Sequence, residues 1–321
     1  RRLLGAAGEE SREVYRALGR GEHRAGRTLD ALQAAYRVGA RVAWQRMSEI
    51  AAAAGAGAAV QRELAGAMFA YIEEIAAESV EGYAEAQLHE AGELERQRAA
   101  LAALLIASPP PDEQAVAGAA AATNWRMPAT VAALAVDAAL TASVRRRLHT
   151  DVIACQSGGL GCLLVPDPAG LGAAARAAAE HVGAAIGVGP GRPLADAHRS
   201  WQLAQLAHEL GRGRPAAVHA DEHLGDLGLL AARDVLPALA AGALEPLRLQ
   251  TASSRGRLAD TLRCWLALNG SPSAVARELG IHPQTVGYRV RRLRELFGAA
   301  LDDPDRRFEL ELALRWQALE R

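Results

Sequence analysis

Three consecutive prolines in "SPPPDE", at positions 109 to 111, divide the chain into two parts with different hydrophobic periodicity. Proline cannot continue a helix, and it restricts the residue before it to extended conformations. Before the prolines, apolar side chains recur three or four residues apart, which is typical of helices. After them, short apolar runs of strand length alternate with helical stretches. Because 321 residues are also too many for one compact core, we expect a mainly helical multidomain protein.

The residues before this break, 1–107, are predicted to form an all-helical input or sensor domain. In "RTLDALQAAYRVGARVAWQRMSEI" the apolar residues lie near a spacing of three to four: Leu29, Leu32, Tyr36, Val38 and Trp44. Glycines in "AAAAGAGAAV" indicate a break between helices. The helical pattern then continues to Ser108 and predicts a long connecting helix. That helix either pairs with a copy of itself or packs on its own domain, and the pattern leaves both open.

The charge, hydropathy and cysteine content limit which partners the chain can bind and in which compartment it is expected. The formal net charge is −1, so a polyanionic partner must be bound by a local patch. No run of about eighteen apolar residues occurs, and the first residues lack the pattern of a signal peptide. These features predict a cytoplasmic protein without a membrane partner. Three cysteines without CxxC spacing predict neither a disulfide framework nor a zinc site.

The next part is predicted to be a linker with a short helix at 108–126, followed by an α/β domain of the ferredoxin-like kind at 127–245. Alternating strand and helix signals with one hairpin are typical of that architecture. The expected strands are at 129–136, 151–156, 160–166 and 184–189, and the expected helices at about 137–148, 168–182 and 194–210.

Gly158 and Gly159 suit a two-residue hairpin turn, because both positions of such a turn favour positive φ. The resulting register places Cys155 opposite Cys162. Two small buried thiols in a reducing compartment are the preferred interpretation, and a redox-sensitive cross-strand bridge is the alternative.

His219 and His223 lie four residues apart, a spacing that could hold a metal ion on a helix. No third ligand is evident beside them. Solvated or hydrogen-bonded histidines are therefore the preferred interpretation, and we expect neither a metal nor another cofactor.

The C-terminal residues, 250–321, are predicted to form a helix-turn-helix domain. Pro272 and Pro283 each suit the first turn of a helix, and Gly280 suits the turn between them. The expected helices are at about 272–279 and 283–297. The second helix has one apolar face, formed by Val286, Val290, Leu293 and Phe297, and a preceding helix can cover it with Leu258, Leu262, Trp265 and Leu266.

The opposite face of the second helix carries the side chains that read or hold DNA. Between Gln284 and Leu296 there are four arginines and one acid, Glu295, a local net charge of +3. Arginine binds guanine edges or phosphates, glutamine reads adenine, and threonine and tyrosine hold phosphates. A solvated basic face is the alternative. The turn glycine, the two prolines and the confined charge favour DNA. The candidate DNA-binding residues are Gln284, Thr285, Tyr288, Arg289, Arg291 and Arg292.

The segment from Leu258 to Leu319 resembles the C-terminal helix-turn-helix of PucR/CdaR-type transcription regulators, a Fis-like variant. The region from Met127 to Leu239, with "GVGPGRPLADAHRSWQLAQLA", resembles the degenerate GGDEF-like domain of the same regulators. The first domain, through "LDALQAAYRVGARVAW", resembles the helical input domain of RsbR-type stress proteins. Two positions depart from the family pattern: Gly287 stands where relatives carry a larger residue, and His282-Pro283 replaces a His-Arg pair.

Catalysis is not expected. A GGDEF-type cyclase needs acidic residues at its hairpin to bind metal, whereas the corresponding turn here is "SGGLGC". No nucleophile with a base and no phosphate-binding loop occurs elsewhere.

The resulting hypothesis is a sequence-specific transcription regulator that receives its signal through the first or middle domain. Its expected partners are double-stranded DNA with an inverted-repeat operator, a small-molecule or protein effector, and further copies of the chain in a homodimer or higher homo-oligomer. The alternative is an adaptor in a stress-signalling complex that binds protein partners through its helical N-terminal domain.

Overall fold

The computed structural model describes residues 9–148 and 151–320, in two compact units that divide between residues 98 and 99. The first unit is all-helical. The second contains one sheet and the C-terminal helices. The expected fold class is confirmed, because a helical N-terminal region precedes an α/β middle region and a helical C-terminal region. None of the described helices is long and apolar enough to span a membrane.

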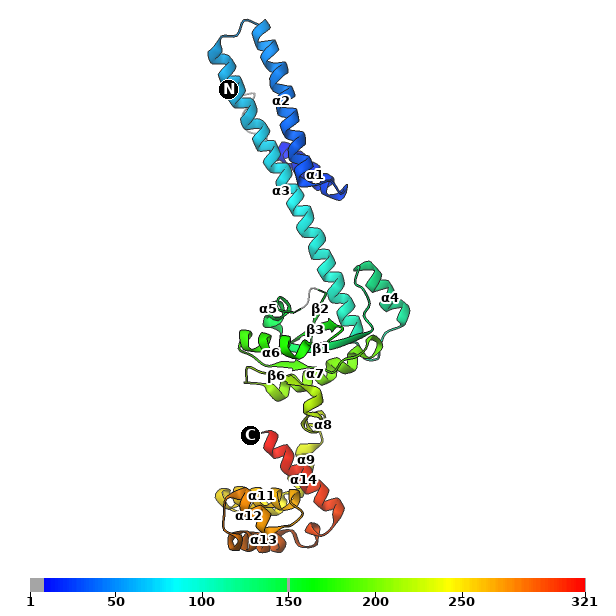
Figure 1. Cartoon of the computed structure of the whole chain (residues 1–321), viewed down its shortest axis with the longest axis vertical. Helices are drawn as coiled ribbons and strands as arrows, with labels where there is room; N and C mark the ends of the chain where they lie inside the picture. Colours follow the sequence, from blue (N-terminus) through cyan, green and yellow to red (C-terminus); the bar gives the residue numbers. More distant parts are fainter. Residues whose placement is uncertain (1–8, 149–150, 321) are drawn as a thin grey trace. The chain divides into compact units, whose positions relative to one another are not determined.

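The first unit contains α1 (Glu9–Arg24), α2 (Leu29–Ala53) and most of α3 (Ala58–Leu105). α3 has 48 residues, and its last turns, from Ala99, belong to the second unit. Figure 1 shows α2 running back along α3. The Thr28 hydroxyl accepts a hydrogen bond from the Ala31 amide at 3.2 Å and so caps α2. Gly55 has a φ of 70° in the break between α2 and α3.

Close backbone contact and ion pairs hold α1 against α3. A Cβ on Gly82 would lie 2.1 Å from the carbonyl oxygen of Arg16, and a Cβ on Gly19 would lie 1.9 Å from that of Ser79. Only glycine permits such an approach. Ion pairs then follow the two helices: Arg12 with Glu74, Arg16 with Glu78 and Arg20 with Glu85. A hydrogen bond joins His23 to Glu90 at 2.7 Å.

The first unit buries few apolar side chains. Leu32, Met68 and Ile75 are buried, whereas Val38 and Val42 of α2 are 50% and 57% exposed. Val38 therefore does not share the buried face of Leu32, although its spacing in the sequence suggested a common face.

The sheet of the second unit has the strand order β2-β3-β1-β4-β6, and β5 also pairs with β1. β4 and β6 are parallel, and the other pairs are antiparallel. Gly158 and Gly159, with φ of 59° and 81°, form the predicted hairpin turn, and Cys155 lies opposite Cys162. The strands are β1 (Thr130–Asp137), β2 (Ile153–Ser157), β3 (Leu160–Pro166), β4 (Ile186–Val188), β5 (Arg192–Pro193) and β6 (Ala217–His219).

Helices cover both faces of this sheet. Alternate residues of β1 point to opposite sides, so that Ala133 packs with α7 (Ala197–Gly211), α4 (Glu113–Ala122) and the end of α3. Leu134 packs on the other side with α6 (Leu171–Val182) and α5 (Thr141–Arg145). Gly187 and Gly189 let α7 lie directly on the sheet, because a Cβ on either would meet an α7 carbonyl oxygen at about 2 Å.

One local expectation for this region is wrong. In place of one helix at 137–148 there is a 3₁₀ turn (Ala138–Leu140) and then the short α5. The Thr141 hydroxyl donates to the Ala138 carbonyl at 2.8 Å, a local bond that competes with a regular helix. His219 ends β6 and His223 precedes α8 (Leu224–Ala231). The two histidines therefore do not share the helix on which the alternative interpretation, a metal site, depended.

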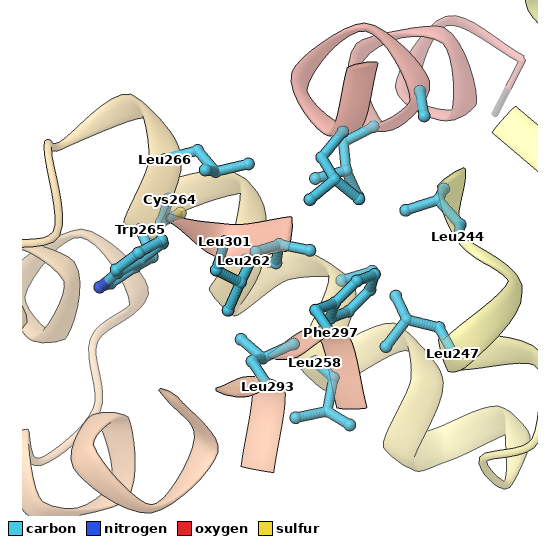
Figure 2. Packing of buried hydrophobic residues seen from close by; sticks show 14 of the residues in the cluster. Leu244, Leu247, Leu258, Leu262, Cys264, Trp265, Leu266, Leu293, Phe297 and Leu301 are labelled. Atoms are coloured by element: carbon cyan, nitrogen blue, oxygen red, sulfur yellow. The ribbon is translucent and has the colours of Figure 1, made fainter. Parts of the chain in front are cut away.

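The C-terminal helices enclose one apolar core, shown in Figure 2. Leu258 and Leu262 of α11 meet Leu293 and Phe297 of α13 there. The segment before α11 also contributes Leu236, Leu244 and Leu247 to this core. The elements are α9 (Leu236–Ala243), α10 (Glu245–Arg248), α11 (Ala252–Ala267), α12 (Pro272–Leu279), α13 (Pro283–Phe297), a 3₁₀ turn (Gly298–Leu301) and α14 (Pro304–Leu319).

Candidate nucleic-acid interface

The turn between α12 and α13 is built by three residues with different roles. Gly280 has a φ of 62°, the left-handed conformation that ends α12. Pro283 is the first residue of α13, where its missing N–H leaves no helical bond unmade. The ring Nδ1 of His282 accepts a hydrogen bond from the Gln284 amide at 3.2 Å and caps α13. Both helices have the bounds expected from the sequence.

The apolar side of α13 faces inward as predicted. Val286 and Leu293 are almost fully buried, and Val290 and Phe297 are 9% and 8% exposed. Val275 and Ala276 of α12 are buried in the same core. Burying side chains of this size stabilises the domain by about 1.5–3 kcal/mol each. This packing fixes which side of α13 meets solvent.

Four of the predicted DNA-binding residues lie on the exposed side of α13. Gln284, Thr285 and Arg291 are exposed, and Tyr288 is 70% exposed. Gln284, Tyr288 and Arg291 follow one another at helical spacing of four and three, so they form one strip. Glutamine and arginine side chains are of the kinds that hydrogen-bond base edges in a major groove.

The other two predicted residues have contacts within the domain. Arg289 is half-buried and donates from Nη1 to the Thr261 hydroxyl of α11 at 3.2 Å. Arg292 donates from Nη1 to Glu295 Oε2 at 2.8 Å, one turn further along α13. The structure therefore places Arg289 on the flank of α13 beside α11, and Arg292 on the exposed side in a surface ion pair.

Two further residues of this surface are not among the six candidates. Arg294 is exposed on the flank of α13 opposite Arg289, and in the described residues neither Arg294 nor Arg291 forms an ion pair. Thr261 is buried, donates to the Arg257 carbonyl at 2.7 Å, and positions Arg289. The excess of arginine pointed to Arg294, but no sequence pattern indicated a threonine on another helix.

The middle domain offers no comparable cluster. Among residues 9–148 and 151–320, no group of three His, Cys, Asp or Glu side chains is placed to hold a metal ion. At the hairpin, a hydrogen bond with Cys162 lowers the pKa of the Cys155 thiol, whereas burial raises the pKa of Cys162. Both thiols are free and buried. This arrangement agrees with the preferred interpretation of two buried thiols.

Two family models match this chain. The PucR-like N-terminal domain matches residues 4–106, and the PucR C-terminal helix-turn-helix domain matches residues 258–316. The second match contains α12 and α13 in full. A regulator of polyketide synthase expression from Bifidobacterium adolescentis has a solved structure that covers 70% of this chain and 99% of its own, at 19% identity and a TM-score of 0.35.

Several curated proteins are similar over part of the chain. An uncharacterised protein in the pkwA 5′ region of Thermomonospora curvata is 36% identical over 126 residues, 39% of this chain and 67% of that protein. An uncharacterised protein of Mycobacterium tuberculosis is 33% identical over 134 residues, 40% of this chain and 31% of its own length. The carbohydrate diacid regulator of Escherichia coli is 40% identical over 68 residues, 21% of this chain and 18% of that regulator. With PucR domains matched at both ends and a known regulator among its relatives, the chain belongs to the PucR family of transcriptional regulators.

Proposed function

We propose that this regulator binds specific DNA sequences by placing α13 in the major groove. The observation that carries the proposal is the exposed strip of Gln284, Tyr288 and Arg291 on a helix whose other side is buried. In this arrangement Gln284, Thr285 and Arg291 contact base edges. Arg289 and Arg292, at the flank and rim, contact phosphates.

The ion pair between Arg292 and Glu295 does not prevent phosphate binding. Both side chains are about half exposed, at 43% and 55%. Exposed pairs contribute only about 0–1 kcal/mol, because water and salt screen them. A phosphate that brings a full negative charge to Arg292 can therefore replace Glu295 at small cost.

We further propose that the chain acts as a homodimer on an inverted repeat, since one reading helix contacts too few base pairs for high specificity. The first unit carries a surface suited to a second copy. Ala31, Ala35, Val38 and Val42 of α2 are all exposed and follow one another at spacings of four, three and four. That spacing matches the seam along which two helices pair. The alternative function, a protein-binding adaptor, would use the same seam for a different protein.

The middle domain is proposed to act as a scaffold or sensor without catalytic activity. Its hairpin turn, residues 157–160, carries no carboxylate to hold a metal for phosphoryl transfer. Incubation with GTP and magnesium is expected to yield no cyclic dinucleotide above background.

The central test compares two arginine variants on the operator found by genome-wide footprinting. Arg291→Ala is expected to weaken operator binding by about 1–3 kcal/mol, because it removes a base contact. Arg315→Ala, which removes an exposed arginine of α14, is expected to leave the affinity unchanged. Fluorescence anisotropy at fixed salt gives both dissociation constants.

Two results would reject the proposal. One is equal operator affinity for wild type, Arg291→Ala and the double variant Arg289→Ala, Arg292→Ala, with the fold intact by circular dichroism. The other is equal affinity for operator and unrelated DNA, together with a stable heterologous protein partner, which the adaptor function predicts.

A further inference from the structure

A buried threonine of α11 holds one side of the Arg289 guanidinium. Thr261 is 0% exposed, and its hydroxyl donates to the Arg257 carbonyl one turn earlier at 2.7 Å. A hydroxyl has a single proton, so this bond leaves only its acceptor lone pairs for other groups. Arg289 of α13 supplies a donor from Nη1 at 3.2 Å. The hydrogen bonds therefore run in one direction, from Arg289 through Thr261 to the backbone of α11.

The four arginines of α13 differ in how firmly they are held. Arg291 and Arg294 are exposed and form no ion pair among the described residues. Arg292 pairs with Glu295, and both side chains are about half exposed. Arg289 is half-buried and bonds a fully buried hydroxyl on another helix. It is therefore the arginine of α13 with the least conformational freedom to lose when DNA binds.

The bond to Thr261 leaves most donors of the Arg289 guanidinium free. Arginine carries five N–H donors in a planar fork, and Thr261 takes one of them. The remaining donors can bind two oxygens of one phosphate. A long side chain that is already held in place loses less entropy on binding. The Thr261 bond therefore prepares Arg289 for a phosphate without using up its binding capacity.

We propose that Thr261 is a positioning residue that holds Arg289 ready to bind a phosphate of the DNA backbone. Through Arg289 it sets the affinity for DNA of any sequence, because phosphates carry no base information. The choice of base pairs stays with Gln284, Thr285 and Arg291. This inference rests on the proposed function, since it gives Thr261 a part in DNA binding by α13.

The test removes the hydroxyl and keeps the shape of the side chain. Thr261→Val is expected to weaken binding to operator and to unrelated DNA by the same factor, about two- to tenfold, the typical contribution of one hydrogen bond. The ratio of the two affinities, which measures base selectivity, is expected to stay constant. Fluorescence anisotropy at low salt gives both affinities, since unrelated DNA binds through its phosphates. Thr261→Ser keeps the hydroxyl and is expected to bind as wild type does.

A double-variant cycle shows whether Thr261 acts through Arg289. In the Arg289→Ala protein, Thr261→Val is expected to change DNA affinity by less than about twofold, because no guanidinium remains to be positioned. Arg289→Ala is also expected to lower the slope of log affinity against log salt by about one, since it removes a phosphate contact. Thr261→Val keeps that charge and is expected to keep the slope.

Thr123→Val is the matched control. Thr123 is also buried and donates to the Ala120 carbonyl at 3.0 Å, but no arginine bonds it in the described part of the chain. Its replacement is expected to leave DNA affinity unchanged. Circular dichroism checks that each variant is folded. If Thr261→Val does not fold, Thr261→Ala lacks the same hydroxyl and carries the same expectations.

Three results would overturn this proposal: wild-type DNA affinity in the folded Thr261→Val protein, an equal loss from Thr261→Val with and without Arg289, or a loss confined to the operator. The last two would mean that Thr261 acts only on the packing of α11 and α13. Normal operator binding by Arg291→Ala rejects the proposed function itself. Weak binding by Arg291→Ala beside an unaffected Thr261→Val rejects this inference alone.

Discussion

Gly280 has a φ of 62° in the turn before α13, whereas Gly287 lies inside α13. At neither position would an added Cβ have a neighbouring atom within 4 Å, so packing does not distinguish them. Backbone conformation therefore decides the effect of adding a methyl group. Alanine strains the left-handed conformation at Gly280 but favours the helix at Gly287.

Gly280→Ala is expected to lower the free energy of unfolding by about 1–2 kcal/mol. Gly287→Ala is expected to raise it by about 1 kcal/mol. Denaturant unfolding followed by circular dichroism measures both values. Equal signs for the two variants would contradict the assigned backbone conformations. Weaker operator binding by the stabilised Gly287→Ala would indicate that the α13 backbone lies close to DNA.

At the residue scale, the sequence predicted positions that obey strong local rules. Gly280, Pro283 and the buried valines of α13 follow from backbone freedom, ring geometry and helical spacing. The contact of Arg289 with Thr261 could not be predicted, because the two residues lie on different helices and are 28 positions apart in the sequence. Such contacts depend on how the helices pack, which periodicity does not specify.

At the scale of single elements, glycine allows α1 and α3 to cross closely. Gly82→Ala places a methyl group against the Arg16 carbonyl oxygen, so α1 must move away. We expect a loss of about 1–3 kcal/mol, typical of overpacking, and faster hydrogen exchange of amides in α1. Mass spectrometry of peptides from residues 9–24 measures that exchange.

Gly66→Ala is the matched control on the same helix, since no atom lies within 4 Å of its added Cβ. It is expected to raise stability by about 1 kcal/mol and to leave exchange in α1 unchanged. Slow exchange of α1 in Gly82→Ala would show that the two helices do not approach as closely as described.

The ends of helices could be predicted where proline or glycine marks them. They could not be predicted where contacts with distant parts of the chain determine the helix length. The bounds of α12 and α13 follow from Pro272, Gly280 and Pro283. In place of the helix expected at 137–148, the α-helix is only the short α5. Thr141 of α5 packs against Gly161 of β3, where an added Cβ would lie 1.9 Å from the Thr141 hydroxyl. Helix propensity was outweighed by a contact between distant parts of the chain.

At the scale of the whole molecule, the exposed seam of α2 predicts the oligomeric state. Val42→Glu places a charge in the seam and is expected to convert a dimer into a monomer, with weaker binding to a full inverted repeat. Leu249→Glu makes the same kind of change at a residue that is 84% exposed outside the seam, and is expected to have no effect. Sedimentation velocity measures the mass of each variant.

An unchanged dimer in Val42→Glu would show that the copies pair through another surface. A wild-type monomer that still protects two half-sites would show that pairing occurs only on DNA. The sequence left open whether its long helix pairs with a copy or packs on its own domain. The exposed side chains of α2 now favour α2 as the helix that pairs. Periodicity alone could not distinguish the exposed face of α2 from its buried face.

The first turn of α13 has no amide left to offer a phosphate. Pro283 has no N–H, the Gln284 amide donates to the His282 ring, and the Thr285 and Val286 amides donate to the His282 carbonyl at 2.9 and 3.3 Å. Helix N-termini commonly grip an anion through such amides. On the proposed function, phosphate contacts near this turn therefore come from guanidinium groups, and we expect operator affinity to fall steeply with rising ionic strength.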